Sequence, residues 1–293
     1  MTSTHVIDVE RLHVSYGTFE AVSDLSLQVR RGELYALLGT NGAGKTSTLE
    51  VVEGHRPATS GTVRVLGERP DDRRAVRPRT GIMLQESGFA NDLTARESVR
   101  LVGRLSGRTD SVDRVLGVVG LGHKADVAVA QLSGGEKRRL DFATAVFGSP
   151  ELVFLDEPTT GLDIQSRDAL WDAVDRLRED GSTVVLTTHY LEEAQQHADR
   201  IGLMHRGTLR QEGTVAELTR TLPAVITFGL PASAPPLPLE ASSTGERTVV
   251  ETFALQQDLH TLLAWAHDHR LELADLDAGP TRLDDVFRAL DAD

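Results

Sequence analysis

The chain has 293 residues, of which 40% are apolar and 26% charged, the composition of a globular protein with one large domain or two ordinary ones. Its net charge of −13 argues against a nucleic-acid-binding protein, and no apolar run approaches the roughly 18 residues of a membrane-spanning helix. The lack of cysteine excludes disulfides and thiolate metal sites, and with an N-terminus lacking a signal-peptide pattern it favours a cytoplasmic protein.

The first half of the chain begins with strand patterns and continues with helical ones. Alternating or β-branched apolar residues predict strand-like segments at 6–16 and 25–39, of which 34–38 is the strand before a glycine-rich turn, and a further strand at 61–67. The turn is followed by a helix, predicted over 46–54. Apolar residues at helical spacing over 93–105 and 111–122 predict a helical insertion that covers about residues 88–148.

The second half alternates regularly between helices and strands. Helices are predicted at 137–148, 164–180 and 191–199, and strands at 151–157, 182–189 and 200–207. Strands separated by helices of this length usually pair in parallel. The pattern therefore predicts an α/β fold built on a parallel sheet.

A smaller unit is predicted at the C-terminus, over residues 223–293, so that the main domain covers 1–222. Its patterns predict strands at 224–230, 248–254 and 272–278 and helices at 258–270 and 281–290. The segment 230–246 is rich in Pro, Ser and Ala and is predicted to be a loop. We expect a small α+β extension.

A phosphate-binding pattern follows the strand that ends near residue 38. The motif G-x-x-x-x-G-K-[ST] is occupied by Gly39, Thr40, Asn41, Gly42, Ala43, Gly44, Lys45 and Thr46, with Ser47 next in the chain. Glycines let successive N–H groups point inward as an anion cradle, and the helix that follows adds its positive end. The pattern predicts an ATP site rather than an ordinary glycine-rich turn.

Lys45 is one of only three lysines in a chain that carries 31 Lys and Arg residues together. A compact ammonium can reach the β- and γ-phosphates inside the cradle, where a broad planar guanidinium would fit poorly. The Thr46 hydroxyl is a predicted Mg²⁺ ligand. The cofactors expected at this site are therefore ATP and Mg²⁺.

Two carboxylates end the apolar run of residues 152–155. A run buried on both faces places the residues after it at the strand's C-terminal end, where α/β sheets bind ligands. We predict that Asp156 binds Mg²⁺ and that Glu157 is the general base for the attacking water. His189, at the end of a later strand, is predicted to hydrogen-bond the γ-phosphate.

A second helix start carries the sequence QLSGGEK at residues 131–137. There Ser133, Gly134 and Gly135 form a second predicted anion-binding nest. The sequence resembles the LSGGQ signature of ATP-binding cassette (ABC) ATPases, and the other motifs of that family follow at similar spacing over residues 5 to about 220. Glu136 stands where glutamine is usual. A carboxylate there would repel nucleotide slightly, but we expect the departure to be minor.

The resemblance implies roles for several further residues. Tyr16 matches the aromatic residue that stacks on adenine, and Gln85 matches the glutamine that senses the γ-phosphate and belongs to the Mg²⁺ site. Asp163 matches the loop at the dimer interface, and His189 matches the switch histidine. Ser133, Gly134, Gly135 and Glu136 would face the nucleotide of a second copy. The implied fold is a P-loop NTPase core with an N-terminal antiparallel β subdomain and a helical subdomain insertion.

Residues 81–101 and 281–290 are similar to the ATPase subunits of daunorubicin-resistance-type (ABC-2) exporters. This similarity implies two partners, a second copy in a head-to-tail dimer and a separate transmembrane permease. It implies no nucleic-acid partner and a peripheral location at the cytoplasmic face of the membrane, with contact to the membrane only through the permease.

Two other classes of ABC ATPase remain as alternatives. One is a soluble ATPase that serves cofactor assembly without a permease, and the other is a nucleic-acid-associated machine. The C-terminal extension is compatible with either a regulatory module or a support for the dimer.

Smaller features are predicted to be structural. The run Lys137, Arg138 and Arg139 is expected to be a solvated helix face. Trp171 and Trp265 lie in helical patterns and are predicted to be packing residues.

Overall fold

The structure is a computed structural model that describes residues 4–85, 88–220, 222–231, 234–245 and 247–292. Its contacts divide the chain into two compact units, Met1–Thr214 and Val215–Asp293. The predicted boundary at 222/223 lies later, because the short helix α8 (Val215–Thr219) packs against the last helix and so belongs to the second unit.

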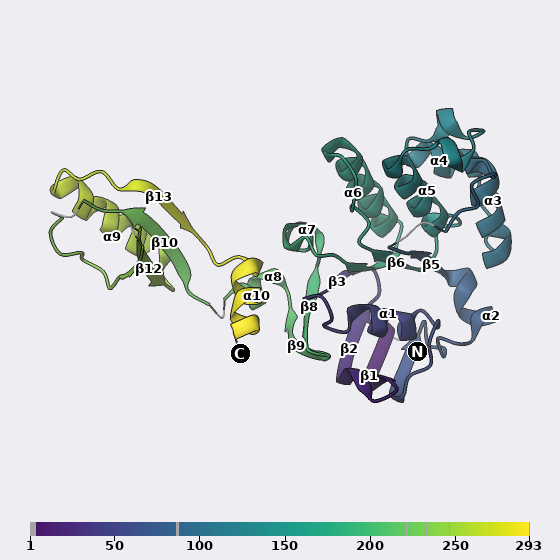
Figure 1. The fold of residues 1–293 in the computed structure, drawn as a ribbon, viewed down its shortest axis with the longest axis horizontal. Helices are drawn as coiled ribbons and strands as arrows, with labels where there is room; N and C mark the ends of the chain where they lie inside the picture. The colour runs from purple at the N-terminus through teal and green to yellow at the C-terminus, as the bar shows by residue number, and fades with distance from the viewer. Residues whose placement is uncertain (1–3, 86–87, 221, 232–233, 246, 293) are drawn as a thin grey trace. The chain divides into compact units, whose positions relative to one another are not determined.

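The first unit is built on a six-stranded sheet with the order β5-β6-β7-β3-β8-β9 (Figure 1). Its strands are β3 (Leu34–Gly39), β5 (Thr80–Met83), β6 (Leu152–Asp156), β7 (Thr183–Thr187), β8 (Arg200–His205) and β9 (Thr208–Gly213). The first five in this order are parallel, which confirms the predicted parallel sheet, although β5 itself was not predicted. The edge strand β9 is antiparallel to β8 and was not predicted.

The parallel strands end along one edge of this sheet. Asp156 at the end of β6 is in register with Thr187 of β7, and Thr187 is also in register with Leu37 of β3. The loops after β3, β6 and β7 therefore start side by side, where α/β sheets place their ligands. Each of these strands is buried along almost its whole length, which explains the continuous apolar runs of the sequence.

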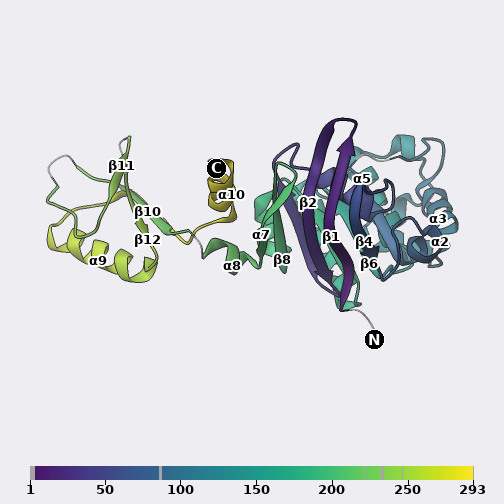
Figure 2. The ribbon, with the colours of Figure 1, turned by 90° about the horizontal axis from the view of Figure 1, so that it is seen from below.

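A three-stranded antiparallel sheet precedes and adjoins this core. Its strands are β1 (His5–Tyr16), β2 (Phe19–Arg30) and β4 (Ser60–Val65), in the order β2-β1-β4 (Figure 2). Its inward-facing side chains pack in one apolar cluster with helix α1 (Lys45–Val52) and with Tyr35 and Leu37 of β3. This packing holds the start of α1 against the sheet edge.

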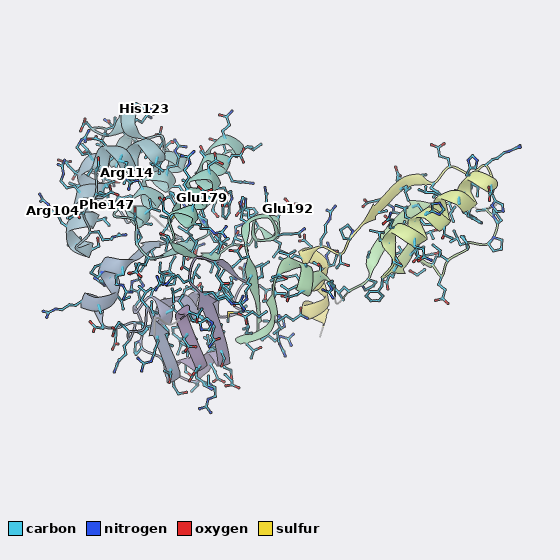
Figure 3. The ribbon with its side chains drawn as sticks, turned by 180° about the vertical axis from the view of Figure 1, so that it is seen from behind. Arg104, Arg114, His123, Phe147, Glu179 and Glu192 are labelled. Carbon is cyan, nitrogen blue, oxygen red and sulfur yellow. The ribbon has the colours of Figure 1, made fainter. Side chains whose placement is uncertain are left out.

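Three helices lie between β5 and β6 and form the predicted helical insertion. They are α3 (Ala95–Ser106), α4 (Val112–Val118) and α5 (Gly134–Val146), and they cluster together in Figure 1. α3 begins with a capping box of Thr94 and Glu97. Gly103 lies against the ring of Phe147, where an added Cβ would be 2.4 Å from a ring carbon; Phe147 and the neighbouring Arg104 are labelled in Figure 3.

The remaining helices of the first unit are shorter or cover the sheet. They are α2 (Arg73–Val76), α6 (Ile164–Glu179) and α7 (Leu191–His197), with single 3₁₀ turns at Arg77–Arg79, Gly122–Lys124 and Val129–Gln131. Trp171 of α6 is buried and stacks on His197 of α7, with ring centroids 3.9 Å apart. The predicted packing role of Trp171 is confirmed.

The second unit is an antiparallel sheet of order β11-β12-β10-β13 with helices. Its elements are β10 (Ala224–Gly229), β11 (Ser242–Thr244), β12 (Arg247–Thr252), α9 (Leu255–Asp268), β13 (Ala274–Gly279) and α10 (Leu283–Ala292). Ile226, Phe228 and Val250 of the sheet pack with Leu262 and Trp265 of α9. The unit is α+β, as predicted. β11 lies within the predicted loop 230–246, of which 232, 233 and 246 are outside the described residues.

The architecture confirms the predicted fold class, with an α/β core, an N-terminal antiparallel sheet and a C-terminal α+β extension. No helix among the described residues is long and apolar enough to cross a membrane.

Candidate nucleotide-binding site

The turn between β3 and α1 has the backbone geometry of an anion cradle. Gly42 and Gly44 have positive φ values of 80° and 98°, which glycine adopts without strain. A Cβ at Gly44 would lie 2.5 Å from the carbonyl oxygen of Ala21, so only glycine fits there. The N–H of Ala43 donates to the Thr40 carbonyl at 3.0 Å and closes the turn.

The donors of this turn fit a polyphosphate. Within the part of the chain that the structure describes, the backbone N–H groups of Gly42, Gly44, Lys45 and Thr46 donate to no protein acceptor. They lie at the start of α1, where the helix dipole favours negative charge. Unpaired N–H groups at a helix start are the donor set that phosphate oxygens require.

Lys45 lies over the cradle. Its Nζ donates to the carbonyl of Gly39 at 2.6 Å and to that of Thr40 at 3.2 Å. Partial burial lowers the pKa of Lys45, while the nearby Glu157 and Asp156 carboxylates act in the opposite direction. These two carbonyls are neutral partners, so an anionic phosphate would be a stronger one for the ammonium.

Asp156 ends β6 beside this cradle, and its Oδ1 accepts a hydrogen bond from the Thr187 hydroxyl. Burial raises the pKa of Asp156, as does the neighbouring Glu157, whereas the bond from Thr187 lowers it. A bound divalent cation would offset this burial by pairing with the carboxylate. Thr46, in the first turn of α1, is exposed, so Asp156 and Thr46 offer the hard oxygen ligands that Mg²⁺ prefers.

Glu157 is contacted by two of the other predicted residues. His189 Nδ1 is 3.2 Å from Oε1 of Glu157, and Gln85 Nε2 donates to Oε2 at 3.4 Å. The hydroxyl of Thr160 also donates to Oε2, at 3.4 Å. The structure therefore brings together, around one carboxylate, residues from the ends of β5, β6 and β7.

The backbone of Glu157 is in a sparsely populated conformation. Its φ is 48°, and for a non-glycine residue this costs about 1–3 kcal/mol. The conformation is held in part by the Glu157 N–H, which donates to the Thr187 carbonyl at 2.9 Å. In this conformation the Glu157 carboxylate lies close enough to Lys45 of the cradle to oppose the lowering of the Lys45 pKa.

Tyr16 is placed beside α1 by contacts that the sequence did not predict. Its hydroxyl is 3.2 Å from Ser47 Oγ and donates to Glu50 at 3.1 Å. The guanidinium of Arg56 lies over the ring, 4.1 Å from its centroid, and donates to Glu50 at 2.9 Å. The residue is nevertheless 41% exposed. Tyr16 thus presents a fixed aromatic surface next to the cradle, with Glu50 and Arg56 as its supports.

The second predicted nest begins α5. Ser133 caps this helix by accepting from the Glu136 N–H at 3.3 Å, and the Glu136 carboxylate accepts from the Ser133 N–H at 2.9 Å. A capping interaction of this kind contributes about 1 kcal/mol. Gly134 is exposed, and within the described residues its N–H and that of Gly135 donate to no protein acceptor.

The negative charge of the Glu136 carboxylate is also balanced by a nearby lysine. Its Oε1 pairs with Lys124 Nζ at 2.6 Å, and this bond, with the one from Ser133, lowers the pKa of Glu136 to about 2. The predicted repulsion of nucleotide is therefore offset by Lys124. The side chain faces its own helix start and caps it, and the contact of Glu136 with nucleotide stays a prediction.

Asp163 caps α6, with Oδ1 accepting from the Ser166 N–H at 2.7 Å, and this bond lowers the pKa of Asp163. It is exposed, and the adjacent Ile164 is 75% exposed. Across the described residues, no hydrogen bond or ion pair joins residues 133–136 to residues 39–47. The two anion nests of one chain are therefore separately built.

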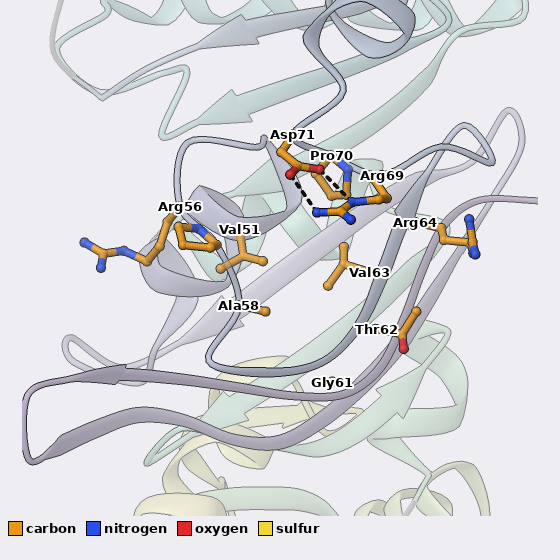
Figure 4. Close-up of a pocket in the computed structure, with 11 residues that line it drawn as sticks. Val51, Arg56, Ala58, Gly61, Thr62, Val63, Arg64, Arg69, Pro70 and Asp71 are labelled. Carbon is orange, nitrogen blue, oxygen red and sulfur yellow. Dashed lines mark hydrogen bonds and ion pairs between the residues drawn. The ribbon is translucent and has the colours of Figure 1, made fainter.

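A hollow of about 420 Å³ lies elsewhere, between the end of α1 and β4 (Figure 4). It is lined by Val51, Arg56, Val63 and Arg69, among others, and Arg69 closes on Asp71 through two hydrogen bonds of 3.0 and 2.8 Å. None of the predicted phosphate or Mg²⁺ ligands lines it. The candidate site is the open sheet edge instead.

Comparisons with known proteins agree with this geometry. The family model described as "ABC transporter" matches residues 22–160, and a C-terminal domain model described as "ABC transporter domain-containing protein-like" matches residues 224–281. The Nod factor export ATP-binding protein I of Ralstonia nicotianae is 34% identical, over 98% of this chain and 94% of that protein.

Two further matches each cover about three quarters of the chain. The daunorubicin/doxorubicin resistance ATP-binding protein DrrA of Streptomyces peucetius is 39% identical, over 75% of this chain and 68% of that protein. A solved ATP-binding subunit of an ABC transporter is 26% identical, covers 74% of this chain and 92% of its own, and superposes with a TM-score of 0.69. The chain belongs to the family of ABC transporter ATP-binding proteins and is an ATPase of that family.

Proposed function

We propose that this chain is the MgATP-hydrolysing subunit of an ABC exporter and that it works as a head-to-tail dimer. The observation that supports it most is the convergence of Gln85, Thr160 and His189 on the carboxylate of Glu157, beside the phosphate cradle. In this proposal the cradle binds the phosphates and the nest at Ser133 closes on the nucleotide bound by the other copy.

Before hydrolysis, the nucleotide is bound by residues of the cradle and of α1, with Tyr16 beside them. The N–H groups at the start of α1 and the Lys45 ammonium bind the β- and γ-phosphates, and Tyr16 stacks on the base. Thr46, Asp156 and the Gln85 side-chain oxygen would hold Mg²⁺, which supplies a positive charge to the phosphate oxygens.

Hydrolysis requires a proton acceptor for the attacking water. In this proposal Glu157 accepts that proton as the water oxygen attacks the γ-phosphorus and the bond to the β-phosphate oxygen breaks. His189, whose Nδ1 is 3.2 Å from Glu157 Oε1, donates to a γ-phosphate oxygen in the same proposal. Asp163, exposed at the start of α6, is proposed to contact the second copy.

The partner that makes use of this cycle is proposed to be a separate transmembrane permease. The names of the relatives, which describe Nod factor export and daunorubicin resistance, favour an exporter. Leu101 and Leu105, one helical turn apart on α3, are 45% and 74% exposed and offer an apolar surface for such a partner. The chain would then lie at the cytoplasmic face of the membrane, attached only through the permease.

The test of the chemistry is steady-state ATPase activity. Glu157→Gln should bind MgATP with unchanged affinity and lose about 10²–10⁴ in turnover, the usual contribution of a general base. Normal turnover in this variant would contradict the assignment of Glu157.

The test of the partner is co-purification. Tagged Glu157→Gln chain can be purified with MgATP from detergent-solubilised membranes of its host. A polytopic membrane protein should co-purify with it in equal amount. Recovery of only a soluble homodimer would contradict the permease and favour a soluble ABC ATPase.

A further inference from the structure

Arg138 is a buried cation in the second turn of α5. The sequence predicted that it would lie on a solvated helix face, but it is 6% exposed, so that prediction is wrong for this residue. Its guanidinium faces the ends of β5 and β6, and not solvent. Each of its hydrogen bonds to the residues that the structure describes is accepted by a backbone carbonyl.

Every N–H donor of the guanidinium can be matched to an acceptor. Nη1 donates to the carbonyls of Leu84 and Gln85 at 2.6 and 3.0 Å, Nη2 to those of Asp156 and Glu157 at 2.5 and 2.7 Å, and Nε to that of Pro158 at 3.3 Å. An Arg side chain has five N–H donors, and here they meet five carbonyl oxygens. Burial lowers the pKa of Arg138, with the nearby acidic groups opposing the shift.

The bonds of Nη2 bear directly on the conformation of Glu157. Rotation about φ of Glu157 turns the peptide group that contains the Asp156 carbonyl, and rotation about ψ turns the Glu157 carbonyl. One nitrogen of Arg138 holds both of these oxygens, and so fixes both torsions of a residue whose φ is 48°. The Pro158 carbonyl, bound by Nε, fixes the next peptide group.

We propose that Arg138 is a positioning residue that holds Glu157 in its strained conformation and so aims its carboxylate. This inference rests on the proposed role of Glu157 as the general base. The bonds of Nη1 extend the same support to the backbone of Gln85, whose side chain also contacts Glu157. One side chain therefore links helix α5 to the backbone of Gln85 and to the backbone of the proposed base, Glu157.

The experiment compares steady-state kinetics of Arg138→Met, Arg138→Lys and wild type. Methionine keeps much of the volume and no donor, so kcat should fall about 10²-fold, the usual effect of a catalytic group displaced by about 1 Å. KM and MgATP affinity should change less than about threefold, because the phosphate cradle is untouched. Lysine retains a cation with three donors and should be intermediate.

Arg108→Met is the matched control. Arg108 is also buried, and it donates to the carbonyls of Thr144 and Ala145 near the other end of the same helix, at 3.1 and 2.8 Å. Its replacement removes a buried guanidinium from carbonyl acceptors of α5 without touching Glu157. It should lower the melting temperature as Arg138→Met does, yet leave kcat within about twofold of wild type.

A cycle with Glu157→Gln separates the two proposals. If Glu157→Gln retains normal turnover, the proposed base is wrong whatever Arg138 does. If it loses turnover, Arg138→Met should reduce the residual rate of the Glu157→Gln chain less than about threefold, because the effect acts through the base. A full further loss of about 10²-fold in that background, or a kcat of Arg138→Met equal to that of Arg108→Met, would overturn the role of Arg138.

Discussion

Lys45 and Arg138 are both cations that face backbone carbonyls, yet they are different residue types for a physical reason. Lys45 binds the carbonyls of Gly39 and Thr40 from within a tight turn, where a compact ammonium can exchange them for phosphate oxygens. Arg138 has five fixed acceptors in a buried space, which only the five donors of a guanidinium can satisfy. The first cation is suited to bind a ligand and the second to hold backbone.

The role of Lys45 leads to a prediction about binding. Lys45→Ala should weaken MgATP binding by about 2–5 kcal/mol, which is about thirtyfold to several thousandfold in affinity, because phosphate oxygens lose a partly desolvated cation. The fold should persist, since among the described residues the Lys45 side chain bonds only to the carbonyls of Gly39 and Thr40. Binding can be measured by calorimetry and the fold by circular dichroism; unchanged MgATP affinity would contradict the assignment.

At the scale of elements, the strand ends decide where the site lies. Much of it could be predicted from sequence, because a motif such as residues 39–46 specifies its own strand, turn and helix. The short edge strands β5 and β9 were missed, since four or six residues at an edge carry little apolar pattern. Thr187, which bonds Asp156, could be found only once β6 and β7 were known to be neighbours.

Arg138 shows a different limit of sequence patterns. In a run of three cations, no spacing rule tells which one is buried, because burial depends on carbonyls that arrive from β5 and β6. The same holds for Glu136, whose neutralising partner Lys124 lies in a separate turn. Such pairs depend on tertiary contacts between segments that are distant in sequence.

One prediction concerns Glu151, which ties the start of β6 to two other segments. It pairs with Arg79 at 2.6 Å and with Arg31 at 3.0 Å, and chiefly the bond from Arg79 lowers the pKa of Glu151 from 4.5 to about 2. A carboxyl with a lowered pKa stabilises the fold above its unfolded pKa and loses that effect as pH falls through its folded pKa. Wild type should therefore exceed Glu151→Gln in stability at pH 7, with the difference shrinking between pH 4.5 and about 2.

The measurement for Glu151 is the urea midpoint of both proteins at several pH values. The two chains share every other titrating group, so the difference between them isolates this carboxyl. A stability difference that stays constant down to pH 2 would contradict the role given to Glu151.

At the scale of the whole molecule, the two anion nests are the basis for the second copy that we propose. One nest is the cradle at the start of α1 and the other is the start of α5, and each is complete in its own backbone. Two copies related by a two-fold axis would pair the cradle of one with the nest of the other, giving two equivalent sites. Each ATP site then takes its cradle from one chain and its second nest from the other.

Mixing two defective chains tests this sharing. Lys45→Ala and Ser133→Arg should each be inactive alone, because every site of a homodimer then lacks one component. A heterodimer of the two has one intact site, so an equal mixture should recover about a quarter of wild-type turnover if chains pair at random and sites act independently. Wild-type turnover from Ser133→Arg alone would contradict a shared site.

The most direct test of the account is the sedimentation of the Glu157→Gln chain with and without MgATP. This variant keeps the cradle, Lys45 and the nest at Ser133, and lacks only the proposed base. We predict a dimer with MgATP, and a monomer both with MgADP and when Lys45→Ala is added to the same chain. A monomer at saturating MgATP, or a dimer that forms without nucleotide, would contradict the claim that two copies close on shared ATP.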